Sequence, residues 1–201
     1  MKRMLDVVAA VAAAILLSPV FLAVAFAVRM ALGRPVLFRQ RRPGYKERPF
    51  TLYKFRTMTD VVDSYGAPLP DQERLTRIGQ FLRRTSLDEL PQLWNVLRGD
   101  MSLVGPRPLL LQYLPRYTPQ QRRRHEVLPG LTGWAQVMGR NSLSWDQRLQ
   151  FDTWYVEHRS LWLDIRILAM TLRSLILDGG ISHNGHVTMP EFPGSSAGQD
   201  V

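Results

Sequence analysis

The chain has 201 residues, of which 45% are hydrophobic and 21% are charged, so it can bury a core and is not a largely disordered protein. It has no cysteine, which excludes a disulfide scaffold, a zinc–thiolate site, an iron–sulfur cluster and a cysteine nucleophile. The formal net charge is +9, and nearly all of the basic residues are arginine. This bias predicts an anionic partner (nucleic acid, an anionic membrane surface or a phosphorylated substrate), although codon preference alone can produce it.

The first element is an apolar run of 22 uncharged residues, from Val7 to Val28. As a straight helix it would be about 33 Å long, enough to cross the hydrocarbon core of a bilayer. Ser18-Pro19 lies at its centre. Because Pro19 has no N–H to donate to the carbonyl of Ile15, we expect the helix to break there.

Basic residues flank this run on both sides, with Lys2 and Arg3 before it and Arg29 and Arg34 after it. Because lysine and arginine favour the cytoplasmic side, the symmetry favours a re-entrant helix–break–helix that enters the membrane and returns. An ordinary kinked transmembrane helix is a second interpretation. A cleaved signal peptide ending near Ala25-Phe26-Ala27 is a third.

The rest of the chain predicts an α+β fold of short elements. We expect a β-hairpin over residues 34–58, with its turn at Arg42-Pro43-Gly44, a surface loop over 59–70 and a strand over 101–104. Apolar spacing predicts helices over 71–84, 144–159 and 160–177, and a short helix from about Asp88 to Leu97. Residues 130–141 are expected to form a loop or a strand.

These elements suggest three parts: a re-entrant membrane segment over 1–33, a cytosolic domain over 34–189, and a polar, glycine-containing tail over 190–201 that we expect to be disordered. The helix over 160–177 has a wide apolar face interrupted by charges. That face suits either the membrane interface or a buried core.

Two adjacent carboxylates, Asp88 and Glu89, stand at the expected start of the short helix. Ser86 and Glu89 match a capping box, whereas Asp88 as N-cap would place Pro91 in the first turn. Either arrangement gives the carboxylates a purely structural role. The functional alternative is an exposed nucleophile beside a metal ligand.

Cationic side chains near this pair favour the functional alternative. They are Lys54 and Arg56 on the hairpin, Arg83 and Arg84 before the pair, and Arg107 in a rigid Gly-Pro-Arg-Pro turn. Fixed cations and a divalent metal would allow a carboxylate to approach a phosphate. The histidines (His125, His158, His183 and His186) are scattered, so we expect neither a histidine base nor, from the last two, a metal site.

Three long motifs carry a resemblance to a known family. They are YKFRTM at 53–58, TSLDELPQLWNVLRGDMSLVGPRP at 85–108 and PGLTGWAQVMGRN at 129–141. Together with the Ser-Pro break they resemble the monotopic phosphoglycosyl transferases, small bacterial sugar transferases that begin glycoconjugate assembly. The resemblance covers about nine-tenths of the chain. Met138 departs from the pattern, because asparagine is expected there.

The resemblance implies an enzyme of the bacterial inner membrane whose catalytic domain faces the cytoplasm. It implies transfer of a phosphosugar from a UDP-sugar to polyprenyl (undecaprenyl) phosphate, in a ping-pong reaction through a covalent phosphosugar-aspartate that releases UMP. Carried over residue by residue, Asp88 is the nucleophile and, with Glu89, holds Mg²⁺. Arg107, Lys54, Arg83 and Asp164 would bind substrate.

Two rival functions remain open at this point. One is a membrane-anchored basic domain that binds anionic lipid or nucleic acid without catalysis, with the acidic pair as a helix cap. The other is an enzyme that transfers only the sugar and releases UDP. The favoured reading includes membrane lipid but no nucleic acid among the partners, and no motif in the chain reads the substituents of the sugar.

Overall fold

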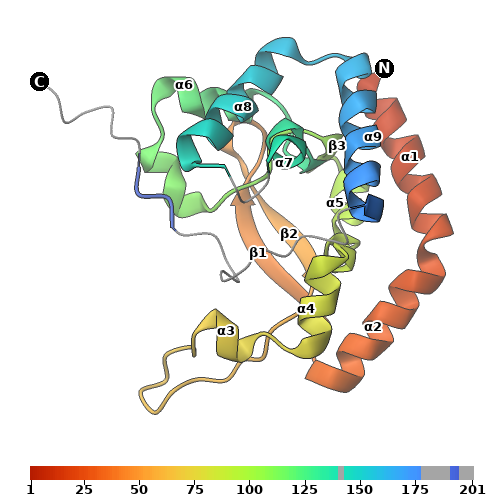
Figure 1. Cartoon of the computed structure of the whole chain (residues 1–201), viewed down its shortest axis with the longest axis vertical. Coiled ribbons are helices and arrows are strands. Elements are labelled where there is room, and N and C mark those ends of the chain that lie inside the picture. Colours follow the sequence, from red (N-terminus) through yellow and green to blue (C-terminus); the bar gives the residue numbers. More distant parts are fainter. Residues whose placement is uncertain (140–142, 178–190, 195–201) are drawn as a thin grey trace, which may run out of the picture.

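The computed structural model describes residues 1–139, 143–177 and 191–194, so His183, His186 and most of the tail lie outside the described residues. The helices are α1 (Lys2–Leu16), α2 (Ser18–Leu32), α3 (Asp71–Arg74), α4 (Arg77–Arg84), α5 (Gln92–Arg98), α6 (Pro119–Arg122), α7 (Trp134–Met138), α8 (Trp145–His158) and α9 (Leu161–Leu177). The strands are β1 (Leu37–Pro43), β2 (Pro49–Phe55), β3 (Ser102–Val104) and β4 (Gly130–Thr132). This mixture of helices with two small sheets agrees with the predicted α+β class (Figure 1).

The predicted β-hairpin is the centre of the molecule. β1 and β2 are antiparallel, with Gln40 opposite Leu52, and Tyr45–Glu47 form a 3-10 turn between them. The strand expected over 101–104 is β3, which pairs in parallel with β4. The second sheet therefore confirms the strand within residues 130–141, but the sequence did not predict α7 in the same stretch.

The helix expected over 71–84 is interrupted. It is divided into α3 and α4, because Leu75 is extended and Thr76 caps the second helix by accepting a hydrogen bond from the backbone N–H of Gly79. The two long C-terminal helices are confirmed as α8 and α9. Ser144 begins α8 with a capping box that includes Gln147.

The apolar N-terminal run is broken where Pro19 predicted it. α1 ends at Leu16 and α2 begins at Ser18, and the hydroxyl of Ser18 donates to the Ile15 carbonyl at 2.8 Å. This hydrogen bond satisfies the acceptor that Pro19 leaves unpaired. No single helix among the described residues is long and apolar enough to cross a membrane, but α1 and α2 pass that test as a pair bent by 63°.

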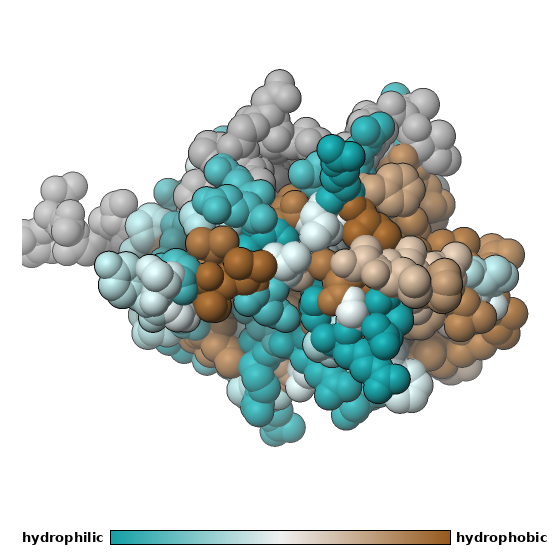
Figure 2. Space-filling view, turned by 90° about the horizontal axis from the view of Figure 1, so that it is seen from below, coloured by the Kyte–Doolittle hydropathy of each residue, from teal (hydrophilic) through white to brown (hydrophobic). Residues whose placement is uncertain are grey.

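Both ends of this helix pair are tied to the rest of the protein. At the beginning of α1, Arg3 donates to the carbonyls of Val96 and Leu97 at 2.6 and 3.0 Å. At the end of α2, Arg56 donates to the Leu32 carbonyl. The pair therefore runs along one side of the domain (Figure 1), and apolar side chains gather on that side (Figure 2).

The helix over 160–177 is partly buried, as one of the two interpretations of its sequence allowed. Leu163 and Ile167 of α9 are buried in a cluster with Val104, Trp134 and Tyr155. The opposite face exposes large apolar side chains, of which Trp162, at 76%, is the most exposed.

The tail is not wholly disordered as expected. The structure describes residues 191–194, and Phe192 is completely buried against the rings of Tyr113, Tyr117 and Trp145. An aromatic side chain that fills such a pocket gains enough apolar burial to order its neighbours. The prediction therefore fails for these four residues, because composition does not reveal a single well-placed anchor.

Candidate active site

Asp88 and Glu89 lie in a short 3-10 turn, Leu87–Glu89, that precedes α5. Neither capping arrangement is present: Ser86 makes no side-chain cap, and the N-cap of α5 is Pro91. Ser86 is left-handed, with φ 58° and ψ 15°. A non-glycine residue in this region carries strain, which proteins retain mostly where geometry serves function. The turn thus presents both carboxylates in a way that capping does not explain.

Apolar contacts with α2 hold this turn in place. Leu87 and Leu90, on either side of the acidic pair, pack against a buried cluster that includes Val24 and Val28 of α2. Phe55 at the end of β2 belongs to the same cluster. The position of the acidic pair therefore depends directly on α2.

The acidic pair lines a cleft of about 690 Å³. Five of the six polar residues that the resemblance assigned to the site line this cleft: Lys54, Arg83, Asp88, Glu89 and Arg107. They come from β2, α4, the 3-10 turn and the loop after β3. The sixth, Asp164, does not line it.

Glu89 is held by two cations. Lys54 Nζ lies 2.6 Å from Glu89 Oε1, and the Arg107 guanidinium donates to the same oxygen and, at 3.4 Å, to Oε2. Burial alone would raise the pKa of Glu89, but Arg107 and Lys54 outweigh it and hold the pKa well below its usual value. Glu89 is therefore ionised and fixed in one orientation.

Asp88 has a different environment. Its side chain is buried, and its contact with Lys54 is longer, at 3.7 Å. Burial raises its pKa above the usual value, although Lys54 works in the opposite direction. No hydrogen bond from the described part of the chain reaches its carboxylate. The two neighbouring carboxylates therefore have different environments: Glu89 is bonded to two cations, whereas Asp88 is buried with its pKa raised.

Close backbone packing fixes the Gly-Pro-Arg-Pro turn that carries Arg107. A Cβ on Gly105 would lie 2.4 Å from the Leu128 carbonyl oxygen, and one on Gly130 would lie 2.1 Å from the Gly105 nitrogen. Such distances exclude any side chain at these two positions. The glycines that punctuate the sequence here let the two segments of the parallel sheet touch, and so fix the backbone of Arg107.

A buried ion pair, which the sequence did not reveal, supports the same turn. Arg124 donates to Asp152 Oδ2 from Nε at 3.1 Å and from Nη2 at 2.6 Å, and both residues are only 2% exposed. The same Nη2 also donates to the backbone carbonyl of Arg107 at 2.7 Å. In the sequence, Arg124 was one member of a basic run with no sign of its partner.

Asn95 is a second residue that sequence reasoning missed. It is fully buried, accepts from the Tyr53 N–H at 3.2 Å and donates to the Thr51 carbonyl at 2.7 Å. These bonds join α5 to β2. They therefore set the distance between the strand that carries Lys54 and the turn that carries Asp88.

Asp164 belongs to a structural network instead of the cleft. Its carboxylate accepts hydrogen bonds from Lys2 Nζ at 2.5 Å and from the Tyr155 hydroxyl at 2.7 Å. Lys2 Nζ also donates to the Val104 carbonyl at 3.3 Å, and the Tyr155 hydroxyl oxygen lies 3.2 Å from the same carbonyl oxygen. The resemblance therefore placed Asp164 in a substrate-binding role that the contacts do not support, since they tie α1 to α9 and β3.

The described histidines and Met138 stand apart from the reacting groups. His125 is buried, and burial together with Arg124 lowers its pKa to about 3, so it stays neutral at physiological pH. His158 stacks on Trp154. Met138 is 43% exposed at the end of α7, and its neighbours Ala135 and Gln136 line the cleft instead.

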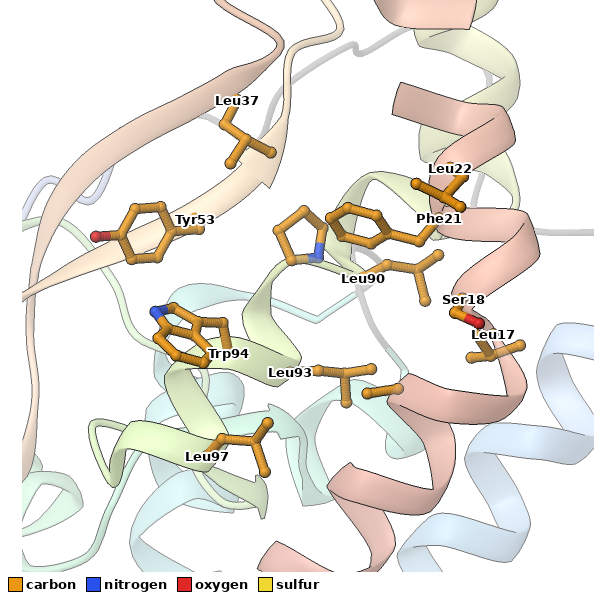
Figure 3. A pocket seen from close by; sticks show the side chains of 12 residues that line it. Leu17, Ser18, Phe21, Leu22, Leu37, Tyr53, Leu90, Leu93, Trp94 and Leu97 are labelled. Carbon is orange, nitrogen blue, oxygen red and sulfur yellow. The ribbon is translucent and has the colours of Figure 1, made fainter. Parts of the chain in front are cut away.

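An apolar groove of about 550 Å³ lies between the α1–α2 bend, the hairpin and α5. Leu90 and Pro91, which follow Glu89 in the sequence, line it together with Trp94 of α5. Figure 3 shows Phe21 of α2 facing Leu90. The groove is lined by Ala14, Leu17, Ser18, Phe21, Leu22, Leu37, Tyr53, Leu90, Pro91, Leu93, Trp94 and Leu97, almost all of them apolar.

Comparison with known proteins identifies the family of this chain. A family model described as bacterial sugar transferase matches residues 1–178. An uncharacterized sugar transferase of Bacillus subtilis, EpsL, is 53% identical over 97% of this chain and 96% of its own length.

Two relatives with named activities are longer proteins. The UDP-glucose:undecaprenyl-phosphate glucose-1-phosphate transferase of Xanthomonas campestris is 45% identical over 85% of this chain and 37% of its own length. The UDP-N-acetylgalactosamine-undecaprenyl-phosphate N-acetylgalactosaminephosphotransferase of Aeromonas hydrophila is 40% identical over 89% of this chain and 44% of its own length. The chain thus spans about two fifths of these two relatives.

Proposed function

This chain belongs to the bacterial sugar transferase family, and we propose that it transfers a sugar phosphate from a UDP-sugar to undecaprenyl phosphate and releases UMP. The observation that carries the proposal is the division of roles in the acidic pair. Glu89 is fixed by Lys54 and Arg107, whereas the adjacent Asp88 is left without a hydrogen bond from the described residues at the bottom of a cationic cleft. The names of two relatives indicate the same pair of substrates for those proteins.

In the first step, an oxygen of Asp88 attacks the phosphorus that bears the sugar. The bond between this phosphorus and the bridging oxygen breaks, and UMP leaves with that oxygen and its electron pair. The product is a sugar phosphate joined to Asp88 as a mixed anhydride. Arg107 and Lys54 stand where they can offset the negative charge that gathers on the phosphoryl oxygens.

In the second step, a phosphate oxygen of undecaprenyl phosphate attacks the same phosphorus. The bond to Asp88 breaks, which restores the carboxylate and leaves a diphosphate between the lipid and the sugar. A covalent intermediate lets one cationic cleft receive two anionic substrates in turn. The route needs no water and no redox partner.

A magnesium ion fits this site. Mg²⁺ takes oxygen ligands, commonly one or two carboxylates together with substrate phosphates and water. Asp88 and Oε2 of Glu89, which has only the long contact to Arg107, could supply the two carboxylates. No group of three or more acidic, histidine or cysteine side chains that could hold a metal occurs in the described part of the chain, so substrate oxygens would complete the shell. When bound, the ion would neutralise the diphosphate.

The membrane geometry also supports a lipid acceptor. Both ends of the α1–α2 pair are bonded to the same domain through Arg3 and Arg56. The bend exposes apolar side chains, with Ile15 70% and Leu16 78% exposed. We propose that this pair is a re-entrant segment in the inner membrane, with the cleft on the cytoplasmic side where UDP-sugars are found.

In this arrangement the apolar groove is suited to the polyprenyl tail. It opens between the bend and α5, and Leu90, which directly follows the acidic pair in the sequence, is among the residues that line it (Figure 3). A tail lying in it would bring its phosphate toward Asp88. Burial of apolar surface, at about 25 cal/mol per Å², would provide the binding free energy.

The direct test is the intact mass of the purified protein after incubation with Mg²⁺ and a panel of UDP-sugars, without acceptor. We expect the mass of one sugar phosphate to be added to the wild type and not to Asp88→Asn. Addition of undecaprenyl phosphate should remove the adduct. Release of UDP instead of UMP would show transfer of the sugar alone, and no product from any donor would contradict the proposal.

A second measurement tests the roles of the ion and of Arg107. Removal of Mg²⁺ with a chelator, and separately Arg107→Ala, should abolish turnover while the circular dichroism spectrum stays unchanged. Binding of lipid or nucleic acid that is sensitive to salt but insensitive to Asp88→Asn would instead favour the non-catalytic rival. Family membership and the division of roles in the acidic pair favour the transferase.

A further inference from the structure

A side pocket of about 240 Å³ continues from the cleft. The two share Arg42, Lys54, Arg107 and Arg148 among their lining residues, so they adjoin. The side pocket is smaller than the 300–1,000 Å³ that is usual for a whole drug-sized ligand. It therefore suits one planar part of a substrate whose reacting part lies in the cleft.

The lining of the side pocket is cationic and aromatic. Its basic lining residues are Arg42, Lys54, Arg107 and Arg148, and no aspartate or glutamate among the described residues lines it. Burial and the nearby Arg107 lower the pKa of Arg42 to about 10, so the cation is retained at neutral pH at an energetic cost. An anionic ligand would remove this cost.

Two aromatic rings form a rigid wall. Trp145 and Tyr113 meet edge to face with ring centroids 5.6 Å apart, and Phe192 packs on both of them. Tyr113 is 5% exposed, and Trp145 is half-buried and lines the pocket. Arg148, which also lines the pocket, lies over the Trp145 ring with its guanidinium carbon 5.4 Å from the ring centroid, so a planar ring can pack against the guanidinium and indole together.

Gln92 supplies a polar group with an unsatisfied hydrogen bond. It is only 3% exposed and lines the side pocket, and its side-chain nitrogen is buried without a hydrogen-bond partner in the described part of the chain. A buried unpaired donor costs about 1–3 kcal/mol. An amide can rotate to present either its oxygen or its nitrogen, so it can both donate to and accept from one ligand.

We propose that this side pocket binds the uracil ring of the UDP-sugar and that Gln92 pairs with the imide edge of that ring. The amide nitrogen would donate to the uracil O4, and the amide oxygen would accept from N3–H. The shared arginines would then direct the diphosphate from the side pocket toward Asp88.

This inference rests on the proposed function, and the chemistry of the relatives agrees with it. The two named relatives act on different sugars, glucose and N-acetylgalactosamine, and both names specify UDP. Because the uracil ring is common to these substrates and the sugar differs, we expect the uracil subsite to be the rigid part that these enzymes share. An adaptable sugar site would then lie elsewhere in the cleft.

The test is calorimetric titration of the purified full chain with UMP and with ribose 5-phosphate, which lacks the base; neither titration needs turnover. Gln92→Met keeps the volume and removes the pairing, so it should bind UMP about tenfold more weakly than the wild type does, because about one hydrogen bond of roughly 1.4 kcal/mol is lost. Its affinity for ribose 5-phosphate should be unchanged. Gln92→Glu keeps an acceptor for N3–H but loses the amide donor, so it should also weaken UMP binding.

Gln136→Met is the matched control. Gln136 also has buried, unpartnered amide atoms, but it lines the main cleft and not the side pocket. Its substitution should leave the affinity for UMP unchanged. If Gln92→Met and Gln92→Glu bind UMP as tightly as the wild type does, or weaken the binding of ribose 5-phosphate by the same factor, the uracil assignment is wrong. The mass adduct with UDP-sugar would still support the proposed function in that case, whereas no binding of UMP at all would contradict both.

Discussion

The side chain of Arg124 donates a hydrogen bond of 2.7 Å to the backbone carbonyl of Arg107. Arg124 is 2% exposed and forms a buried ion pair with Asp152. This hydrogen bond fixes the backbone of Arg107, and so helps to direct its guanidinium toward Glu89. This is a positioning role, because Arg124 meets the reacting groups only through Arg107.

Two sets of variants separate this positioning role from stability. Arg124→Met leaves Asp152 as a buried unpaired charge, and we expect it to lower the free energy of unfolding by about 3–5 kcal/mol. The double variant Arg124→Met with Asp152→Leu removes both charges and should recover most of that loss in a thermal melt. Its kcat should nevertheless remain well below that of the wild type. Full recovery of kcat in the double variant would show that the pair serves stability alone.

The two carboxylates should respond differently to neutralisation. Because the fold raises the pKa of Asp88, its ionisation at neutral pH opposes folding, so Asp88→Asn should melt no lower than the wild type while forming no adduct. Glu89→Gln removes the carboxylate that pairs with Lys54 and Arg107, and should cost about 1–2 kcal/mol of stability. An adduct on Asp88→Asn, seen by intact mass, would reverse the assigned roles.

The rate of UMP release should depend on the ionisation of Asp88. A raised pKa means that acidification protonates the nucleophile at a higher pH than for an ordinary aspartate, so the rate falls earlier as the pH is lowered. Lys54 works to lower this pKa. Lys54→Met should therefore move the acid limb of the pH profile to still higher pH. Lys46→Met, at an exposed lysine of the hairpin turn, should leave the limb in place, and an unmoved limb in Lys54→Met would exclude this coupling.

The apolar groove should matter to the second half-reaction alone. Trp94→Ser removes a 57% exposed ring from its wall, and we expect about a tenfold higher KM for undecaprenyl phosphate, equivalent to about 1.4 kcal/mol. Adduct formation from the UDP-sugar should be unchanged. Trp162→Ser is the control, because that ring on α9 is 76% exposed and does not line the groove. Equal effects of the two substitutions on acceptor KM would point to general membrane contact.

The bend between α1 and α2 predicts that the N-terminus lies on the cytoplasmic side of the membrane. A cysteine introduced at the N-terminus should be labelled from the cytoplasmic side, and the chain has no other cysteine to confuse the result. Ser18→Ala with Pro19→Ala removes both the break and the hydrogen bond to Ile15, so the straightened helix should span the membrane and move the label to the periplasmic side. Periplasmic labelling of the unaltered break would refute the re-entrant arrangement.

The sequence alone determined those features that depend on local chemistry. Pro19 cannot continue a helix, so the break was predictable, and the alternating hairpin and the capped α8 follow from short-range patterns. The motifs around Asp88, Glu89 and Arg107 were also sufficient to indicate the family. Each of these signals lies within a few consecutive residues or in one ordered motif.

Only the tertiary structure determined which distant residues meet. Lys2 and Asp164 are far apart in the chain, and only the fold shows that their ion pair anchors α1 and does not serve the cleft. In the same way, Arg124 forms its ion pair with Asp152, which lies 28 residues further along the chain. No local rule predicts such pairs, because long-range contacts depend on the packing of all the intervening elements.

The same reason explains the division of roles in the acidic pair. Asp88 and Glu89 are neighbours of similar chemistry, and the sequence could assign their roles only by resemblance. The fold brings Lys54 from β2 and Arg107 from the loop after β3 to one carboxylate, and leaves the other buried with its pKa raised. Burial and charge proximity are properties of the assembled cleft, and they are the basis on which we propose Asp88 and not Glu89 as the nucleophile.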